Sequence, residues 1–140
     1  MSRIFWDTNL FIYLFEGDGP LHARVVDLRR NMLERGDQLV TSALTLGEIL
    51  VKPLERGNAE LAAKYEEAVT STSLMIGFDV RAARIYASLR SDRSIRAPDA
   101  IQLACAAAAG VDLFITNDDR LSAKRVDGIQ FVVPLGRAPL

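Results

Sequence analysis

Two patterns of hydrophobic residues alternate along this chain. Short apolar runs are typical of buried strands, and longer segments with apolar residues three or four positions apart are typical of helices. The strand-like segments lie at 4–6, 38–41, 73–78, 112–116 and 129–133. Because helical segments separate these strands, the pattern predicts right-handed crossovers and a mainly parallel sheet.

Several of the expected helices carry signals at their ends. Asp79 is suited to cap a helix N-terminus, and Gly36 and Gly110 are placed as C-terminal caps. Pro53 lacks a backbone N–H, so we expect it to kink or shorten the helix that contains Glu48. The expected helices cover 10–16, 20–35, a segment from 46 onward, 59–69, a segment after 79, 99–109 and a short stretch within 118–125.

The apolar faces of two helices suggest how the layers pack. The helix at 99–109 is apolar almost all round, which predicts deep burial. The helix at 20–35 is expected to bury Leu21, Val25, Leu28, Met32 and Leu33. Together these patterns predict one domain over residues 1–140 with an α/β fold. Its expected architecture is a three-layer α/β/α sandwich around a mainly parallel sheet of about five strands.

Composition adds an expectation about the compartment. A single cysteine, Cys105, forms no disulfide framework and is typical of a reducing cytoplasm. The first residues lack the basic and apolar pattern of a signal peptide, and no apolar run is long enough to span a membrane. We therefore expect a cytoplasmic protein without membrane contact. The net charge of −1 gives no bulk signal for nucleic acid, although an acidic site would offset a basic rim.

Acidic residues at unusual places are the main candidates for chemistry. Asp7 ends an apolar strand, Glu48 lies within an apolar run, and Asp99 opens the most apolar helix. Asp118 and Asp119 follow another apolar strand. Each residue alone has an ordinary explanation as a turn residue, a cap or a helix N-terminal charge. Together they are expected at the carboxyl edge of the sheet, where open α/β proteins bind ligands.

A cluster of four carboxylates needs a compensating charge. Two unit charges about 4 Å apart repel by about 4 kcal/mol at an effective dielectric constant of about 20. Such a site must take up protons or bind a cation, and its hard oxygen ligands suit Mg²⁺ or Mn²⁺. Cations held in this way usually keep several waters and bind phosphates. This donor set favours hydrolysis of a phosphodiester by a metal-activated water.

The sequence excludes several other mechanisms. His22 is the only histidine, so a ribonuclease with two catalytic histidines is excluded. Neither the strand–turn–helix motif of a catalytic serine nor a glycine-rich phosphate loop is present. Cys105 lies within an alanine-rich run and is interpreted as a small core residue.

The order of four short motifs resembles the PIN domain, and the chain resembles the VapC-type toxins of bacterial toxin–antitoxin pairs. These motifs are Asp7-Thr8-Asn9, Glu48, Pro98-Asp99-Ala100 and Thr116-Asn117-Asp118. The resemblance implies an endoribonuclease in which Asp7, Glu48, Asp99 and Asp118 hold Mg²⁺ or Mn²⁺. It implies that Asn9 and Thr116 orient these carboxylates, and that Asp119 could replace or assist Asp118. It also implies an RNA substrate, a homodimer and a small antitoxin that blocks the cleft.

Two other classes of function remain open from the sequence. A receiver-like signalling module shares the expected architecture, but no aspartate follows 38–41 and no lysine follows 129–133. A non-catalytic PIN-fold protein-binding module would have little use for four carboxylates. Four basic residues near the expected site are candidate phosphate contacts, with solvated surface as the alternative: Arg93, Arg96, Arg120 and Lys124.

Overall fold

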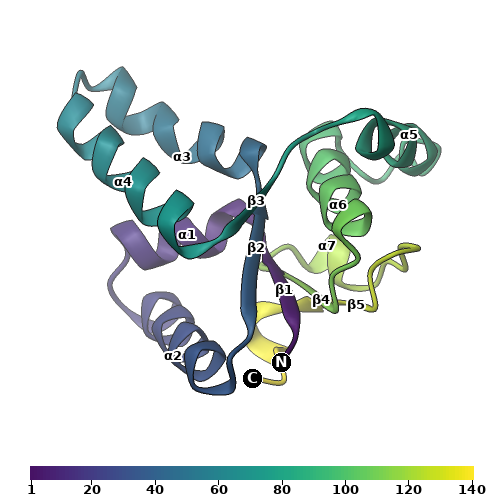
Figure 1. Cartoon of the computed structure of the whole chain (residues 1–140), viewed down its shortest axis with the longest axis horizontal. Helices are drawn as coiled ribbons and strands as arrows, with labels where there is room; N and C mark the ends of the chain where they lie inside the picture. The colour runs from purple at the N-terminus through teal and green to yellow at the C-terminus, as the bar shows by residue number, and fades with distance from the viewer.

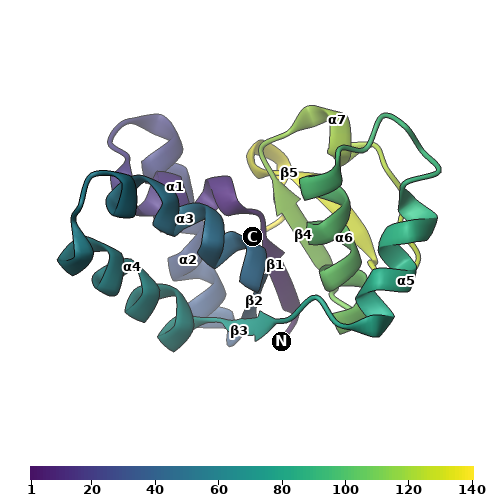
Figure 2. The same ribbon diagram turned by 90° about the horizontal axis from the view of Figure 1, so that it is seen from above.

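A five-stranded sheet separates two layers of helices (Figures 1 and 2). The structure is a computed structural model that describes residues 1–140. β1 (Arg3–Trp6) lies at the centre, between β2 (Gln38–Ser42) and β4 (Leu113–Thr116), and β3 (Leu74–Ile76) and β5 (Phe131–Pro134) form the edges. All four pairings are parallel, in the order β3-β2-β1-β4-β5, so the predicted α/β fold with a parallel sheet is confirmed.

Helices fill every connection between consecutive strands. Those that follow β1 and β2 cover one face of the sheet, and the two between β3 and β4 cover the other (Figure 2). None of them has the length and apolar character needed to cross a bilayer. They are α1 (Thr8–Glu16), α2 (Pro20–Arg35), α3 (Ala43–Glu55), α4 (Ala59–Thr72), α5 (Val80–Leu89), α6 (Ala97–Ala109) and α7 (Asp119–Ser122), and the 3₁₀ turn η1 (Leu135–Arg137) follows β5.

Alternate residues of the central strands build two separate cores. Ile4 and Trp6 of β1 pack on the side of α1 and α2, whereas Phe5 packs on the side of α6. Phe5 stacks on Phe114, its register partner in β4, with ring centroids 4.9 Å apart. The central strands are therefore buried on both faces, as the continuous apolar runs in the sequence require.

The strand order places a switch point between β1 and β4. The chain moves outward from β1 through β2 to β3, and then returns to form β4 on the other side of β1. The connections on the two sides of this point leave in opposite directions, which opens a crevice beyond the carboxyl ends of the two strands. Asp7 directly follows β1, and Asn117 and Asp118 directly follow β4.

Most differences from the predicted helix boundaries have local causes. α1 begins at Thr8 rather than at residue 10 because Asp7 acts as its N-cap and accepts a hydrogen bond from the Thr8 N–H. α3 continues past Pro53 to Glu55, because a proline near the end of a helix removes only one intrahelical hydrogen bond. The expected caps hold at Gly36 and Gly110, whose φ angles are 72° and 64°.

The predicted inward face of α2 is partly wrong. Val25, Leu28 and Met32 are fully buried, but the side chains of Leu21 and Leu33 are 43% and 62% exposed. Leu33 follows Met32 by one residue, which turns it by about 100° around the helix axis. Leu21 lies in the first turn of α2, one turn before the first buried residue.

Candidate active site

Four carboxylates line one open cavity at the switch point between β1 and β4. The cavity has a volume of about 280 Å³ and only one hydrophobic residue in its lining. A larger cavity, of about 510 Å³, lies along residues 122–132 but has a single carboxylate, Asp127. The smaller cavity is lined by Asp7, Thr8, Asn9, Ile12, Glu48, Pro98, Asp99, Gln102 and Asp118.

Asp7 is the most buried of the four carboxylates. It is 8% exposed, and both of its oxygens accept hydrogen bonds. Thr8 N–H donates to Oδ1 at 2.9 Å, and Thr116 Oγ1 donates to Oδ2 at 2.9 Å. Burial raises the pKa of Asp7, the negative charge of Glu48 raises it further, and the hydrogen bonds partly offset the rise. The structure thus holds this carboxylate in place while destabilising its charge.

Glu48 reaches the cavity from the sixth position of α3. Its carboxylate accepts a hydrogen bond of 2.6 Å from Thr8 Oγ1. Glu48 is exposed although its neighbours in sequence are apolar, because adjacent residues of a helix point to different sides. Thr8 therefore contacts two carboxylates, that of Asp7 through its backbone and that of Glu48 through its hydroxyl.

Gln102 of α6 links the buried side of the cavity into one network. Its Nε2 donates to Thr45 Oγ1 at 2.7 Å, to Thr8 Oγ1 at 3.1 Å and, more weakly, to Asp7 Oδ1 at 3.4 Å. Its Oε1 accepts a hydrogen bond from Ser42 Oγ. Gln102 is only 2% exposed, so this amide is a buried polar group whose partners all come from other elements.

Sequence reasoning did not identify Gln102, Ser42 or Thr45 as parts of the site. Gln102 is the one polar residue among the buried positions of α6, and that contrast was an available signal. Ser42 is the N-cap of α3, and its Oγ accepts a hydrogen bond from Thr45 N–H at 3.3 Å.

Asp99 lies in the first turn of α6, close enough to Asp7 and Asp118 for their charges to affect its pKa. Burial raises the pKa of Asp99, and the negative charges of Asp7 and Asp118 raise it further. Arg120 and Arg96 lower it by smaller amounts. No hydrogen bond is among the influences on this carboxylate, so Asp99 has charge without a stabilising donor.

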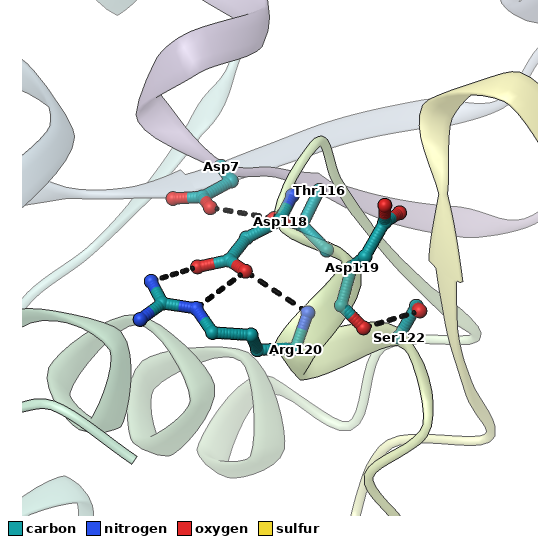
Figure 3. A network of polar contacts seen from close by, with 6 residues as sticks. All are labelled: Asp7, Thr116, Asp118, Asp119, Arg120 and Ser122. Carbon is teal, nitrogen blue, oxygen red and sulfur yellow. Dashed lines mark hydrogen bonds and ion pairs between the residues drawn. The ribbon is translucent and has the colours of Figure 1, made fainter. Parts of the chain in front are cut away.

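Asp118 is the one carboxylate of the cavity with a close cationic partner. Arg120 Nε and Nη2 contact its two oxygens at 3.0 and 2.7 Å, and the Arg120 backbone N–H donates to Oδ1 at 3.0 Å (Figure 3). These contacts lower the pKa of Asp118. Its backbone N–H donates to Thr116 Oγ1 at 3.0 Å, so Thr116 joins Asp118 to Asp7.

The other predicted supporting residues have different positions. Asn9 lines the cavity and is exposed. Asp119 lies outside the cavity, and its carboxylate points away from Asp7 and Asp118 (Figure 3). It lines a separate groove with Arg137, because the turn into α7 sends neighbouring side chains to opposite sides. The structure thus brings Asp118, and not Asp119, to the other carboxylates.

The remaining candidates are scattered. Lys124 pairs with Asp92 at 2.8 Å, whereas Arg93 and Arg96 are exposed and form no ion pair. The ring of His22 contacts the Tyr13 carbonyl at 2.9 Å, and His22 does not line the cavity. Cys105 is buried in the core, as expected.

The chemistry of the cavity fits a hydrated divalent cation. No three carboxylate, imidazole or thiolate groups are arranged to hold one ion directly. Burial is the main cause of the raised pKa values of Asp7 and Asp99, neighbouring carboxylates raise them further, and the oxygens of both residues are hard ligands. Mg²⁺ typically uses one or two carboxylates and keeps several waters, which matches this arrangement.

Comparisons with known proteins agree on the relationship of this chain. A family model described as "PIN domain" matches residues 4–128. Ribonuclease VapC23 of Mycobacterium tuberculosis (strain CDC 1551 / Oshkosh) is 32% identical over 123 residues, which cover 86% of this chain and 96% of the relative.

Two solved structures share the fold. VapBC2 from Rickettsia felis, bound to a DNA fragment from its promoter, matches with a TM-score of 0.71 and 17% identity, over 94% of this chain and 98% of that one. A toxin–antitoxin complex from Klebsiella pneumoniae matches with a TM-score of 0.66 and 23% identity, over 90% of this chain and 94% of that one. At these identities the likeness establishes the fold alone.

Proposed function

Since this chain belongs to the PIN-domain family and, within it, to the VapC-type ribonuclease toxins of type II toxin–antitoxin pairs, we propose that its acidic cavity cleaves RNA internally with a divalent cation. One observation carries this proposal. Four carboxylates line a single polar cavity, and the pKa values of Asp7 and Asp99 are raised there. A bound cation would offset both the burial of these carboxylates and their repulsion by neighbouring carboxylates.

We assign the roles of the four carboxylates from their surroundings. Asp7 and Asp99 act as direct ligands of Mg²⁺ or Mn²⁺, because burial raises the pKa of both and the charge of Asp7 raises that of Asp99 further. Glu48 and Asp118 act through water molecules of the hydrated ion. Thr116 and Asn9 support this set, Thr116 through its hydrogen bond to Asp7.

The protein positions these groups before RNA arrives. Thr8 and Thr116 hold both oxygens of Asp7, so the direction of its remaining lone pairs is fixed. Gln102 keeps the Thr8 hydroxyl aligned with Glu48. A divalent cation held there would supply Lewis acidity, which lowers the pKa of water and offsets charge that develops on the phosphate.

Cleavage of RNA by the purified protein tests this function. Activity should require added Mn²⁺ or Mg²⁺, and Asp7→Asn and Asp99→Asn should each lower it by at least about 100-fold, since loss of outer-shell partners alone costs 10–100-fold. Asp127→Asn removes the same charge from an exposed loop and should leave activity unchanged. Circular dichroism shows whether the variants fold. Asn variants that cleave as fast as the unchanged protein would refute the assignment.

A non-catalytic PIN-fold binding module remains the second candidate, and metal binding separates the two. Calorimetry with Mn²⁺ should give heat for the unchanged protein and much weaker binding for Asp99→Asn. A protein that binds partners but no cation would show no heat. The receiver-like alternative is set aside, because family membership places the chain elsewhere.

We propose two protein partners for this chain, a small antitoxin and a second copy of itself. The solved neighbours from Rickettsia felis and Klebsiella pneumoniae come from antitoxin-containing systems. Large apolar residues are also exposed: Val51 and Leu54 on α3 at 50% and 57%, Phe78 just before α5 at 48%, and Val80, the first residue of α5, at 68%. Analytical ultracentrifugation of the purified chain tests the homodimer.

A further inference from the structure

Arg120 occupies both oxygens of a carboxylate that belongs to the acidic cavity. Its Nε and Nη2 contact Oδ1 and Oδ2 of Asp118 at 3.0 and 2.7 Å, as a two-pronged pair (Figure 3). Asp118 lines the cavity together with Asp7 and Asp99. Arg120 therefore gives Asp118 a cationic partner, which the other three carboxylates lack.

This contact stands in the way of a cation that would use Asp118. Each oxygen of Asp118 already receives a guanidinium N–H, and Oδ1 also receives the Arg120 backbone N–H. Oδ1 therefore has both lone pairs occupied and Oδ2 has one left, and a divalent ion that uses the free lone pair, directly or through its water, is repelled by the adjacent guanidinium. The guanidinium and the ion therefore compete for the same carboxylate.

The Arg120 side chain is free to leave. It is 55% exposed, whereas the Asp118 side chain is 22% exposed, and Arg120 forms no other ion pair. Exposed ion pairs of this kind change an equilibrium constant by no more than about fivefold, so exchange is easy. A released guanidinium beside the cavity has the planar donor fork that matches a phosphate group.

We propose that Arg120 is an exchangeable counter-ion of the site: it neutralises Asp118 in the metal-free protein and, when a divalent cation takes over that carboxylate, turns to bind a phosphate of the RNA strand. The inference rests on the proposed function, because it assumes that the cavity binds a cation and RNA.

Titration of Mn²⁺ alone into the protein tests the first half. Arg120→Gln removes the competitor and should bind Mn²⁺ more tightly, by about two- to fivefold. Arg120→Lys keeps the charge but loses the two-pronged contact, so its gain should be smaller. Arg125→Gln is the matched control, because Arg125 is exposed, lies outside the cavity and forms no ion pair. It should bind Mn²⁺ like the unchanged protein.

Binding of a short single-stranded RNA in Ca²⁺ tests the second half, with the RNA length checked on a gel after each measurement. Arg120→Gln should bind RNA more weakly, and the slope of log affinity against log salt should fall by about 0.7, the value for one lost phosphate contact on a single strand. Arg120→Lys should keep the slope. A residue with a merely structural role would not raise metal affinity while lowering RNA affinity.

The outcomes separate this inference from the proposed function. If Arg120→Gln binds Mn²⁺ no more tightly than the unchanged protein, Arg120 is not a competitor and the inference fails. Equal RNA affinity and equal salt slopes would also overturn it. If the unchanged protein binds no Mn²⁺ at all, the proposed function fails with it.

Discussion

Asp7 and Asp118 line the same cavity, yet their surroundings differ in almost every physical respect. Asp7 belongs to a buried half of the site, together with Ser42, Thr45 and Gln102. Each polar group in this half has a hydrogen-bond partner from another element. Asp118 lies in an exposed half, formed with Arg120 on the next helix, whose contacts are local in sequence. The buried half fixes the position of Asp7, whose pKa is raised, and the exposed half balances the charge of Asp118 with that of Arg120.

This contrast follows from the positions of the two residues in the sheet. Asp7 follows the central strand, between two layers of helices, so its donors must come from the protein. Asp118 lies in the turn before α7, where the exposed side chain of Arg120 supplies the balancing charge. Substitutions should therefore affect stability strongly in the buried half and weakly in the exposed half.

The largest effect is expected for Gln102→Leu. The substitution leaves the hydroxyls of Ser42 and Thr45 without their buried partner, and an unsatisfied buried group costs about 1–3 kcal/mol. We expect a loss of about 2–3 kcal/mol in the free energy of unfolding and a 10- to 100-fold loss of activity. Urea denaturation and RNA cleavage measure the two.

Gln130→Leu is the matched control for this variant, because Gln130 is exposed. Its stability should stay within about 0.5 kcal/mol of the unchanged protein. Equal stability of the two variants would show that the buried network around Gln102 does not hold the site together.

An intermediate effect of opposite sign is expected for Asp99→Asn in the metal-free protein. The raised pKa means that the native state keeps this proton to a higher pH than the unfolded chain does. Ionisation above the ordinary pKa of Asp therefore destabilises the native state, and stability falls as pH rises from about 4 toward neutrality.

Removing the charge of Asp99 should raise stability at pH 7 by about 0.5–1 kcal/mol, allowing for screening by solvent. Thermal unfolding at pH 4 and pH 7 in a chelator measures the gain, which should be largest at pH 7. Added Mn²⁺ should reduce or reverse it. A variant less stable than the unchanged protein at pH 7 would show that Asp99 carries no uncompensated charge.

The smallest effect is expected for Asp118→Asn. The pKa of Asp118 is lowered by Arg120, so this pair stabilises the native state above the ordinary pKa of Asp, and its contribution is lost as pH falls. The pair is exposed and asparagine is also a good N-cap, so the free energy of unfolding at pH 7 should fall by no more than about 0.5 kcal/mol. Urea denaturation checks this. A loss as large as that of Gln102→Leu would mean that Asp118 is structurally as important as the buried half.

The sequence predicted the carboxylates of the site better than the buried hydrogen bonds that hold them. Asp7 and Asp118 were identified because each follows an apolar strand, and parallel strands end at one edge. The choice between Asp118 and Asp119 depends on how the turn into α7 rotates adjacent side chains, which no pattern in the sequence records.

Gln102 could not be assigned a partner from the sequence for a related reason. Its contacts with Thr8 and Ser42 join positions 94 and 60 residues apart, and only the packing of α6 against β2 brings them together. The fold was predicted more fully, because apolar runs and helix end signals are local. The exposed Leu21 and Leu33 show the limit, since a helical stripe does not say where its contact with the sheet ends.

The central position of β1 also has a consequence for synthesis on the ribosome. β1 emerges before the other strands of the sheet, but its pairing with β4 joins Ile4 to Leu113 and must wait until the segment up to β4 has been made. Contacts so distant in sequence form late and slow folding. Asp7 therefore meets Asp118 only after β4 has been made, and a nascent chain cannot assemble the cavity before then.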